Sequence, residues 1–181
     1  MNTPTEIAIT DLTSRDVDDV WDFFQRLPDG DRTFVKQPVT DIDNVRRWMS
    51  DDGARRCIAS IDDRVIGYAA VMPGVGWSRH VGEIRLVVDP ALRGRGLGQR
   101  LARHMVLVGI EHGCNKLVVE VVAEQASTIA LFARLGFRAE ALLEDHVRHP
   151  NGTYHDLIIL SNRTDTDWQL LTTVGLDEPL D

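Results

Sequence analysis

The first half of the chain carries two helix-like patterns set between strand-like ones. Residues 6–10 alternate polar and apolar side chains, which is typical of a half-buried strand. Over residues 16–27 the apolar side chains recur at spacings of three and four, which predicts a helix with one buried face. A polar loop follows over residues 29–39, and then Thr40 and Asp43 resemble a capping box. They predict a second helix that carries Val45, Trp48 and Met49.

The second half is built from strand patterns with two further helices. Residues 57–61 and 65–72 are rich in β-forming residues and flank a short polar turn, which predicts a hairpin. Apolar periodicity predicts helices through residues 101–110 and 127–135. Residues 116–122 form a nearly continuous apolar run, which indicates a strand buried on both faces. The other predicted strands are 83–88, 138–148 and 154–160, so the order is βααβββαβαββ.

Composition and charge narrow the class of protein. A length of 181 residues is typical of one domain with a full core, and 43% hydrophobic residues exclude wholesale disorder. The net charge of −8 gives no long-range attraction for nucleic acid or an anionic membrane, so we expect neither as a partner. The sequence has no apolar run of about 20 residues and no secretory leader pattern. We therefore predict a cytoplasmic domain.

The two cysteines and the C-terminal residues fit that view. Cys57 and Cys114 lie far apart and outside any C-x-x-C spacing, so they predict neither a disulfide framework nor a zinc site. Residues 162–181 contain five acidic residues and one basic residue, with a short apolar patch at Trp168, Leu170 and Leu171. We expect residues 1–161 to form the domain and 162–181 to be an acidic tail. The apolar patch makes a homodimer worth testing.

The segment richest in chemical information joins the strand at 83–88 to the next helix. Gly94, Gly96 and Gly98 remove three side chains where the chain turns, so several backbone amides can face one ligand at a helix N-terminus. This pattern predicts a phosphate cradle. Basic side chains surround it, which suits a ligand with more than one phosphate. They are Arg93, Arg95, Arg100 and Arg103.

Two common nucleotide-binding motifs fit this segment poorly. A Walker loop ends in Gly-Lys-Ser or Gly-Lys-Thr, whereas Gln99 and Arg100 follow Gly98 here. A dinucleotide fingerprint has the spacing G-x-G-x-x-G close after its strand, with an acid about 20 residues further on. The spacing here is G-x-G-x-G, although Glu120 lies at a suitable distance. A dehydrogenase that binds NAD stays open as an alternative.

The residues Arg93-Gly94-Arg95-Gly96-Leu97-Gly98 resemble the [Q/R]-x-x-G-x-[G/A] acyl-CoA pyrophosphate loop of the GNAT acetyltransferase superfamily. The order βααβββαβαββ over residues 6–160 is similar to the GNAT fold. Phe132-Ala133-Arg134-Leu135-Gly136-Phe137 is similar to the family's Tyr-x-x-x-Gly-Phe. The resemblance implies an α+β, three-layer α/β/α fold with a mixed, mainly antiparallel sheet.

The same resemblance implies a cosubstrate site for acetyl-CoA. The amides of Arg93, Gly94, Arg95, Gly96, Leu97 and Gly98 would hold the pyrophosphate, with Gln99 and Arg100 beside them. The backbone of Leu86, Val87 and Val88 would pair with the pantetheine arm as an added strand does. Splaying of the strand at 116–122 would make room for that arm. Gln125, seven residues before Phe132, stands where relatives often have an asparagine, and we expect it to bind the pantetheine amides.

Glu83 is the candidate catalytic residue. An amine nucleophile must lose a proton, because the pKa of a lysine ammonium is about 10.4 in solution. Glu83 begins the strand that leads to the loop, and some members of the superfamily, including bacterial protein-lysine acetyltransferases, place a glutamate base there. Its carboxylate would act directly or through a water. The alternative is a solvent-facing carboxylate that pairs with Arg85 or Arg79.

The position of Phe132 departs from the family pattern. Many members have a tyrosine there that is thought to protonate the leaving CoA thiolate, and phenylalanine has no proton to give. We expect Phe132 to be a core aromatic beside the pantetheine. The thiolate proton would then come from water or another group, or the activity is slow or missing. Tyr154, on the expected acceptor side, is a minor candidate for this acid.

Other reactive side chains predict no second chemistry. His146, His149 and His155 would converge on the terminal hairpin, but no Cys, Asp or Glu completes a ligand set at normal spacing. We therefore expect no metal. Cys114 has no activating pair nearby in the sequence, so an acyl-cysteine route is not expected.

The sequence thus predicts an N-acetyltransferase that carries an acetyl group from acetyl-CoA to a primary amine by direct attack, with backbone amides near Val87 stabilising the oxyanion. The acceptor is expected to be a protein lysine, marginally favoured over a small molecule. Loops 29–39, 74–80 and 149–154 would form its site. A catalytically weak acyl-CoA-binding module stays open as the rival from another class.

Overall fold

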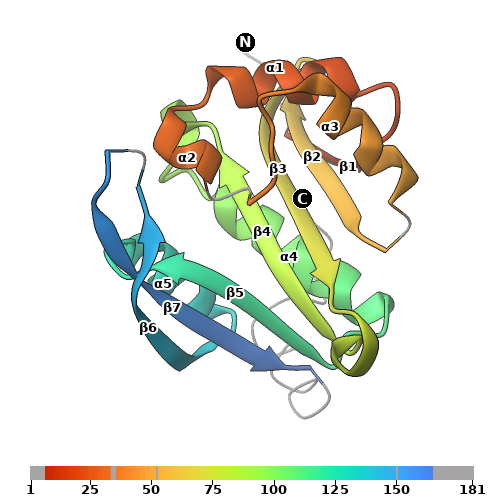
Figure 1. The fold of residues 1–181 in the computed structure, drawn as a ribbon. Coiled ribbons are helices and arrows are strands. Elements are labelled where there is room, and N and C mark those ends of the chain that lie inside the picture. The colour runs from red at the N-terminus through yellow and green to blue at the C-terminus, as the bar shows by residue number, and fades with distance from the viewer. Residues whose placement is uncertain (1–6, 34–35, 52, 150, 165–181) are drawn as a thin grey trace. The chain divides into compact units, whose positions relative to one another are not determined.

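The described part of the chain forms one seven-stranded sheet with the order β1-β2-β3-β4-β5-β7-β6 (Figure 1). The computed structural model describes residues 7–33, 36–51, 53–149 and 151–164. β4 and β5 pair in parallel, whereas the pairs β1–β2, β2–β3, β5–β7 and β6–β7 are antiparallel. The sheet is therefore mixed and mainly antiparallel, as predicted. Its strands are β1 (Ala8–Asp11), β2 (Arg55–Ile61), β3 (Arg64–Pro73), β4 (Val81–Val88), β5 (Lys116–Val122), β6 (Arg138–Arg148) and β7 (Tyr154–Arg163).

The helices follow the predicted order with one addition. A short helix lies at Asp29–Thr33, where the sequence predicted only a polar loop. The predicted capping box is also wrong in detail, because Asp41 is the N-cap of α3 and its carboxylate accepts from the amide of Asp43 at 2.9 Å. The helices are α1 (Val17–Arg26), α2 (Asp29–Thr33), α3 (Ile42–Arg47), α4 (Leu97–Glu111) and α5 (Ala126–Arg134), with 3-10 turns η1 (Trp48–Ser50), η2 (Gly76–Ser78) and η3 (Pro90–Leu92).

The chain divides into two compact units that are interleaved in sequence. The first unit contains the residues up to Val71 together with Arg85–Leu101, and the second contains Met72–Ile84 and the residues from Ala102 onward. Because the chain passes from one unit to the other within β3, β4 and α4, the units are not successive domains. β7 continues to Arg163, past the predicted end of the domain at residue 161. The rest of the predicted acidic tail, residues 165–181, lies outside the described residues.

Aromatic side chains form the core of the first unit. Phe24 on α1 lies edge-on to Trp48 and to Tyr68 of β3, with ring centroids 5.8 and 5.3 Å apart. The residues at the predicted spacings of three and four are buried at Val17, Val20, Phe24 and Leu27, whereas Trp21 is half-buried, and Phe23 is buried in addition. Figure 1 shows α1 and α3 lying against the strands of this unit.

One charged side chain is buried beside this cluster. The guanidinium of Arg56 on β2 pairs with Asp51 at 2.7 Å and lies over the Trp48 ring at 5.3 Å. The hydrogen bond from Arg56 holds the pKa of the Asp51 carboxyl below its usual value. A buried cation tolerates this position because both a carboxylate and an aromatic face compensate for lost water.

The core of the second unit centres on α5 and the strands beside it. Phe132 is fully buried and packs edge-on against Phe137 at 5.1 Å. The amide of Asn162 on β7 donates to the carbonyl of Leu135 at 3.0 Å and so ties the end of α5 to the sheet. In the same unit, Gly109 of α4 approaches Leu117 of β5 so closely that a Cβ at Gly109 would lie 2.7 Å from a Leu117 methyl.

Removing the central aromatic of the first unit tests this packing. Phe24→Ala should lower the free energy of unfolding by about 3–5 kcal/mol, because it deletes a fully buried ring that three other aromatics contact. Denaturant unfolding measures the change. Leu142→Ala on exposed β6 is the control and should stay within about 0.5 kcal/mol of the parent. Equal losses in both variants would contradict the assigned core.

The Asp51–Arg56 pair predicts a dependence of stability on pH. Because the pKa of Asp51 is lowered in the folded state, its contribution is present above the carboxyl's ordinary pKa and is lost as pH falls through the folded value. Asp51→Asn should therefore flatten the acid limb of the stability curve below about pH 4. Denaturant midpoints measured from pH 3 to 7 check this. An unchanged acid limb in the variant would show that other groups cause it.

Candidate active site

The loop between β4 and α4 adopts a backbone that only glycine takes easily at two positions. Gly94 and Gly96 have φ angles of +73° and +84°. A Cβ built at either glycine meets no atom of the chain within 4 Å, so the loop has open space in front of it. The glycines are therefore required for the turn itself, and they leave the backbone accessible.

The first amides of α4 follow directly after this loop. The first helical hydrogen bond runs from the amide of Arg100 to the carbonyl of Gly96 at 3.0 Å. The amides of Leu97, Gly98 and Gln99 consequently have no acceptor within the helix, and they carry the positive end of its dipole. The Leu97 side chain is buried and fixes the helix start in the core of its unit. A bound anion would satisfy these amides.

Contacts with β3 and within the turn at Asp89 fix the segment between β4 and the glycines. The amide of Asp89 donates to the carbonyl of Ile66 on β3 at 2.9 Å, and the Asp89 carboxylate accepts from the amide of Ala91 at 3.0 Å. Arg64 lies 3.5 Å from the same carboxylate. The turn that delivers the chain from β4 to the glycines is thus fixed by both backbone and side chain.

The four predicted arginines do not form one free cluster. Arg93 pairs with Asp31 of α2 at 2.8 Å, and Arg100 donates to the carbonyl of Ile7 at 3.2 Å. Arg95 is exposed on the loop, and Arg103 belongs to the second unit. The sequence pattern gave no sign of the partners of Arg93 and Arg100, because Asp31 and Ile7 are distant in the chain. Among the groups of the first unit predicted to bind phosphate, the backbone amides after Arg93 and the exposed Arg95 are thus the ones for which no protein partner is described.

The three β4 residues predicted to contact pantetheine lie in the first unit. Val87 and Val88 are buried and Leu86 is half-buried, so their side chains belong mainly to the core. A contact with a ligand would use their backbone, as the prediction requires. The expected pairing with pantetheine and the splaying at 116–122 stay predictions.

Glu83 lies in the second unit, on a face of the sheet that a second carboxylate shares. Glu83 is half-buried on β4 and is paired in register with Val118 of β5. Side chains two residues apart on a strand share a face, so Glu120 projects from the same face as Val118 and Glu83. The sequence pattern did not predict a catalytic role for Glu120. The missed signal is the alternation in β5, where Leu117, Val119 and Val121 are buried and the residues between them are not, which corrects the prediction of a continuously buried strand.

Gln125 lies at the start of α5, and Phe132 lies on the buried face of the same helix. Gln125 precedes α5 as its N-cap, and its side chain makes no capping hydrogen bond. Phe132 is a core aromatic, as predicted, and its buried ring has no group that can donate a proton. The side chain of Gln125 is half-buried, and its expected contact with pantetheine amides stays a prediction.

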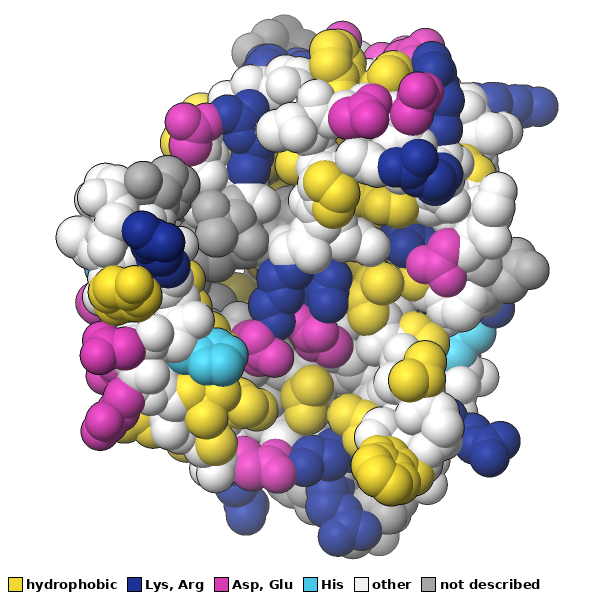
Figure 2. Space-filling view, in the orientation of Figure 1, with side chains coloured by type: hydrophobic (Ala, Val, Ile, Leu, Met, Phe, Trp, Pro, Cys, Tyr) yellow, Lys and Arg dark blue, Asp and Glu magenta, His cyan; other side chains and the backbone are white. Residues whose placement is uncertain are grey.

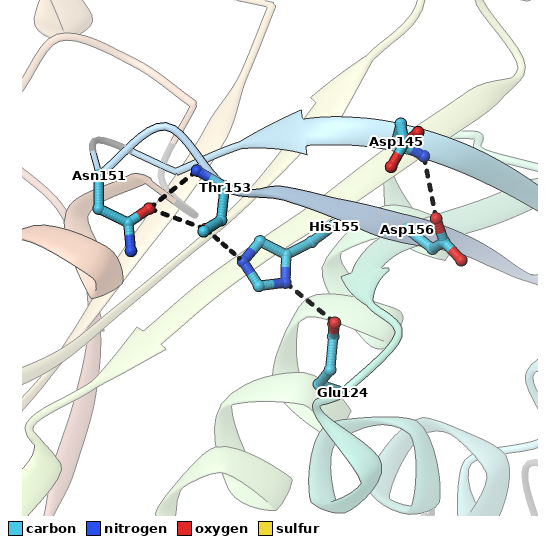
Figure 3. A network of polar contacts seen from close by, with 6 residues as sticks. All are labelled: Glu124, Asp145, Asn151, Thr153, His155 and Asp156. Carbon is cyan, nitrogen blue, oxygen red and sulfur yellow. Dashed lines mark hydrogen bonds and ion pairs between the residues drawn. The ribbon is translucent and has the colours of Figure 1, made fainter.

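A polar network joins the β6–β7 hairpin to the turn before α5 (Figure 3). His155 contacts the Glu124 carboxylate through Nδ1 at 2.9 Å and the Thr153 hydroxyl through Nε2 at 3.1 Å. Asn151 in turn accepts from the hydroxyl and the amide of Thr153, at 2.8 and 3.0 Å. The hydrogen bond from His155 lowers the pKa of Glu124. Sequence spacing alone could not show this network, because Glu124 is 31 positions from His155.

The remaining candidates have structural surroundings. The rings of His149 and His155 are 6.2 Å apart, and the described residues contain no group of three side chains placed to hold a metal. Tyr154 is 56% exposed and lies beneath the Arg148 guanidinium. Cys114 is buried, and burial raises the pKa of its thiol, which disfavours a thiolate nucleophile. Among the described helices none has the length and apolar character to cross a membrane.

Comparisons with known proteins agree with this arrangement. The model of the acetyltransferase (GNAT) family matches residues 18–137. A mycothiol acetyltransferase of Rhodococcus jostii is 43% identical over 58 residues, which is 32% of this chain and 18% of that protein. The match thus spans only about a fifth of that relative. A [ribosomal protein bS18]-alanine N-acetyltransferase of Salmonella typhimurium is 26% identical over 164 residues, with 89% of this chain and 97% of the relative covered.

Solved structures share the fold at low sequence identity. A GNAT-family acetyltransferase of Streptococcus pneumoniae superposes with a TM-score of 0.74 at 17% identity, over 87% of this chain and 99% of that chain. The putative acetyltransferase yncA of Salmonella typhimurium, solved with acetyl-CoA, superposes with a TM-score of 0.73 at 20% identity, over 87% and 93%. The order of elements, the glycine loop before α4 and the family match agree: this chain belongs to the GNAT family of acetyltransferases.

Proposed function

We propose that this chain transfers the acetyl group of acetyl-CoA to a primary amine. The observation that carries the proposal is the loop before α4, where Gly94 and Gly96 leave the first amides of a 15-residue helix free of helical acceptors. Family membership supports CoA as the anion that these amides bind. The yncA structure was solved with acetyl-CoA, which is the same ligand.

Each part of the site has a proposed task in this reaction. The amides from Arg93 to Gly98 bind the pyrophosphate, and the backbone of Leu86–Val88 aligns the pantetheine arm. Glu83 takes a proton from the amine, directly or through a water, and the neutral amine then attacks the thioester carbonyl. The C–N bond forms as the C–S bond breaks, so no acyl-enzyme is needed. An amide near Val87 stabilises the oxyanion.

The acceptor class is the less constrained half of the proposal. Relatives include enzymes named for mycothiol, for glucosamine 6-phosphate and for an alanine of ribosomal protein bS18. All of these names are compatible with amine acetylation, on a small molecule or on a protein. We propose a protein amine, with lysine first, because the net charge of −8 favours a cationic acceptor.

Phe132 supports a second candidate function. A buried phenylalanine at this position has no proton for the leaving thiolate. An acyl-CoA-binding module with little turnover would tolerate this residue, because binding alone requires no thiolate protonation. The two functions differ in one observable, which is CoA release that depends on an amine.

The glycine loop yields a prediction for cosubstrate binding. Gly96→Val places a β-branched residue at a φ of +84°, which costs about 1–3 kcal/mol and misaligns the amides. We expect the dissociation constant for CoA, measured by calorimetry, to rise about tenfold or more. Gly113→Val is the matched control, because Gly113 has a φ of +79°, meets nothing within 4 Å and lies at the far end of α4. Its CoA affinity should not change. Equal loss in both variants would contradict the cradle.

The carboxylates yield a prediction for the chemical step. Glu83→Gln should lower kcat about 10²–10⁴-fold with CoA binding unchanged, because the base is lost and the cradle is not. Thiol release from acetyl-CoA is measured with a lysine peptide, a peptide with an N-terminal alanine and small amines. Glu120→Gln is the comparison, and a larger loss there would assign the base to Glu120.

Two results would reject the proposal as a whole. Absence of CoA binding to the parent protein would remove the cosubstrate and with it the transferase. Tight CoA binding without amine-dependent thiol release from any acceptor in the panel would favour the acyl-CoA-binding module.

A further inference from the structure

The turn between β3 and β4 exposes two large apolar side chains. Val75 is 86% exposed and Trp77 is 94% exposed, whereas the other tryptophans described, Trp21 and Trp48, are half-buried or buried. Figure 2 shows hydrophobic side chains in yellow over this turn, at the lower right of the view. Full exposure of a tryptophan leaves one of the largest apolar surfaces of any residue in water. Val75 and Trp77 lie two residues apart on one turn and together form an exposed apolar patch that a contact can cover.

The turn is also tightly constructed, so the two side chains have a fixed place. The amide of Gly74 donates to the carbonyl of Val81 at 2.8 Å, and the amide of Ser78 donates to the carbonyl of Val75 at 3.1 Å. A Cβ at Gly74 would lie 2.4 Å from the Ser78 carbonyl oxygen, and Gly76 has a φ of +61°. Two glycines are therefore needed to form the 3-10 turn that presents Trp77.

Hydrogen bonds link the last described residue, Thr164, to the end of this turn. His80 ends the turn, and its carbonyl accepts from the amide of Asn115 at 2.8 Å. The carbonyl of Asn115 accepts from the amide of Thr164 at 3.0 Å, and the Thr164 hydroxyl donates to the carbonyl of Cys114 at 2.8 Å. His80 and Thr164 thus flank the same residue, about two strand spacings or 10 Å apart. Residues 165–181 leave the described structure from that point.

The composition of residues 165–181 is complementary to the turn. Trp168 follows Thr164 by four positions, a reach of about 13 Å for an extended chain, which exceeds the separation of about 10 Å from His80 at the end of the turn. The segment contains no Lys, Arg or His, whereas Arg79 and His80 are exposed at the turn. Its apolar residues near the start are Trp168, Leu170 and Leu171, and its acidic residues are Asp165, Asp167, Asp177, Glu178 and Asp181.

We propose that residues 165–181 dock on the β3–β4 turn and cover Val75 and Trp77. Trp168, Leu170 and Leu171 bury the two exposed side chains, and the early acidic residues lie near Arg79. The occupant is this segment because its starting point is fixed beside the turn, so its effective concentration there is high without any partner. The docking depends on neither CoA nor an acceptor.

Fluorine NMR of the full chain labelled with 5-fluorotryptophan tests this docking. Signals of Trp77 and Trp168 are assigned from Trp77→Phe and Trp168→Phe, and their exposure is measured by broadening with a soluble paramagnetic agent. In the parent chain the Trp77 signal should broaden several-fold less than that of free fluorotryptophan. The double variant Leu170→Asp/Leu171→Asp should restore broadening to Trp77. Trp77→Ala should do the same for Trp168.

Controls and opposing outcomes make the test decisive. Leu142→Asp, which changes an exposed residue of β6, should leave both signals unchanged. Sedimentation at several concentrations distinguishes a second copy of the chain, and Trp77 protection that grows with concentration would replace the proposal with a dimer interface. Trp77 broadening equal to that of free fluorotryptophan in the parent chain would overturn the docking outright.

Discussion

The unpaired amides at the start of α4 are the constraint on which the candidate site depends. A helix N-terminus always leaves its first amides without helical acceptors, and most proteins satisfy them with a capping side chain. Here Gly96 stands before the helix, so no side chain caps it, and left-handed backbone at Gly94 and Gly96 keeps the space in front open. The amides of Leu97, Gly98 and Gln99 are thus available to donate to an anion, and the remaining elements of the first unit fix their position.

The supporting contacts explain why charge is arranged as it is. Arg93 and Arg100, which a phosphate would attract, are engaged by Asp31 and by the carbonyl of Ile7. Their guanidinium groups therefore stabilise the loop before any ligand arrives, and Arg93 links it to α2. With a net charge of −8 the protein as a whole repels a polyanion, so the proposed binding of CoA would depend on groups at short range such as the fixed amides. In the proposed reaction the same acidity would favour a cationic acceptor.

Sequence reasoning succeeded where the information is local. Periodicity, glycines and turn residues predicted the order of elements and the loop at Arg93–Gly98, because each depends on neighbours within about one helical turn. It failed for α2, whose Asp31 is held by Arg93 from 62 positions away, and for the face of β5 that carries Glu120. It also missed the contact between His155 and Glu124. These features depend on strand register and tertiary pairing, which a single sequence does not display.

Several side chains of the second unit are poorly suited to protonate a leaving CoA thiolate. Phe132 supplies no proton, Cys114 is buried with a raised thiol pKa, and Tyr154 lies exposed under Arg148. In the proposed reaction the leaving thiolate would take its proton from water, from the amine itself or from His155, which contacts Glu124. If Glu83 takes a proton from the amine and passes it to the thiolate, one carboxylate would serve both as the base for the amine and as the acid for the leaving group. In that case a glutamate on β4 would compensate for the missing tyrosine, and Phe132 would be compatible with turnover.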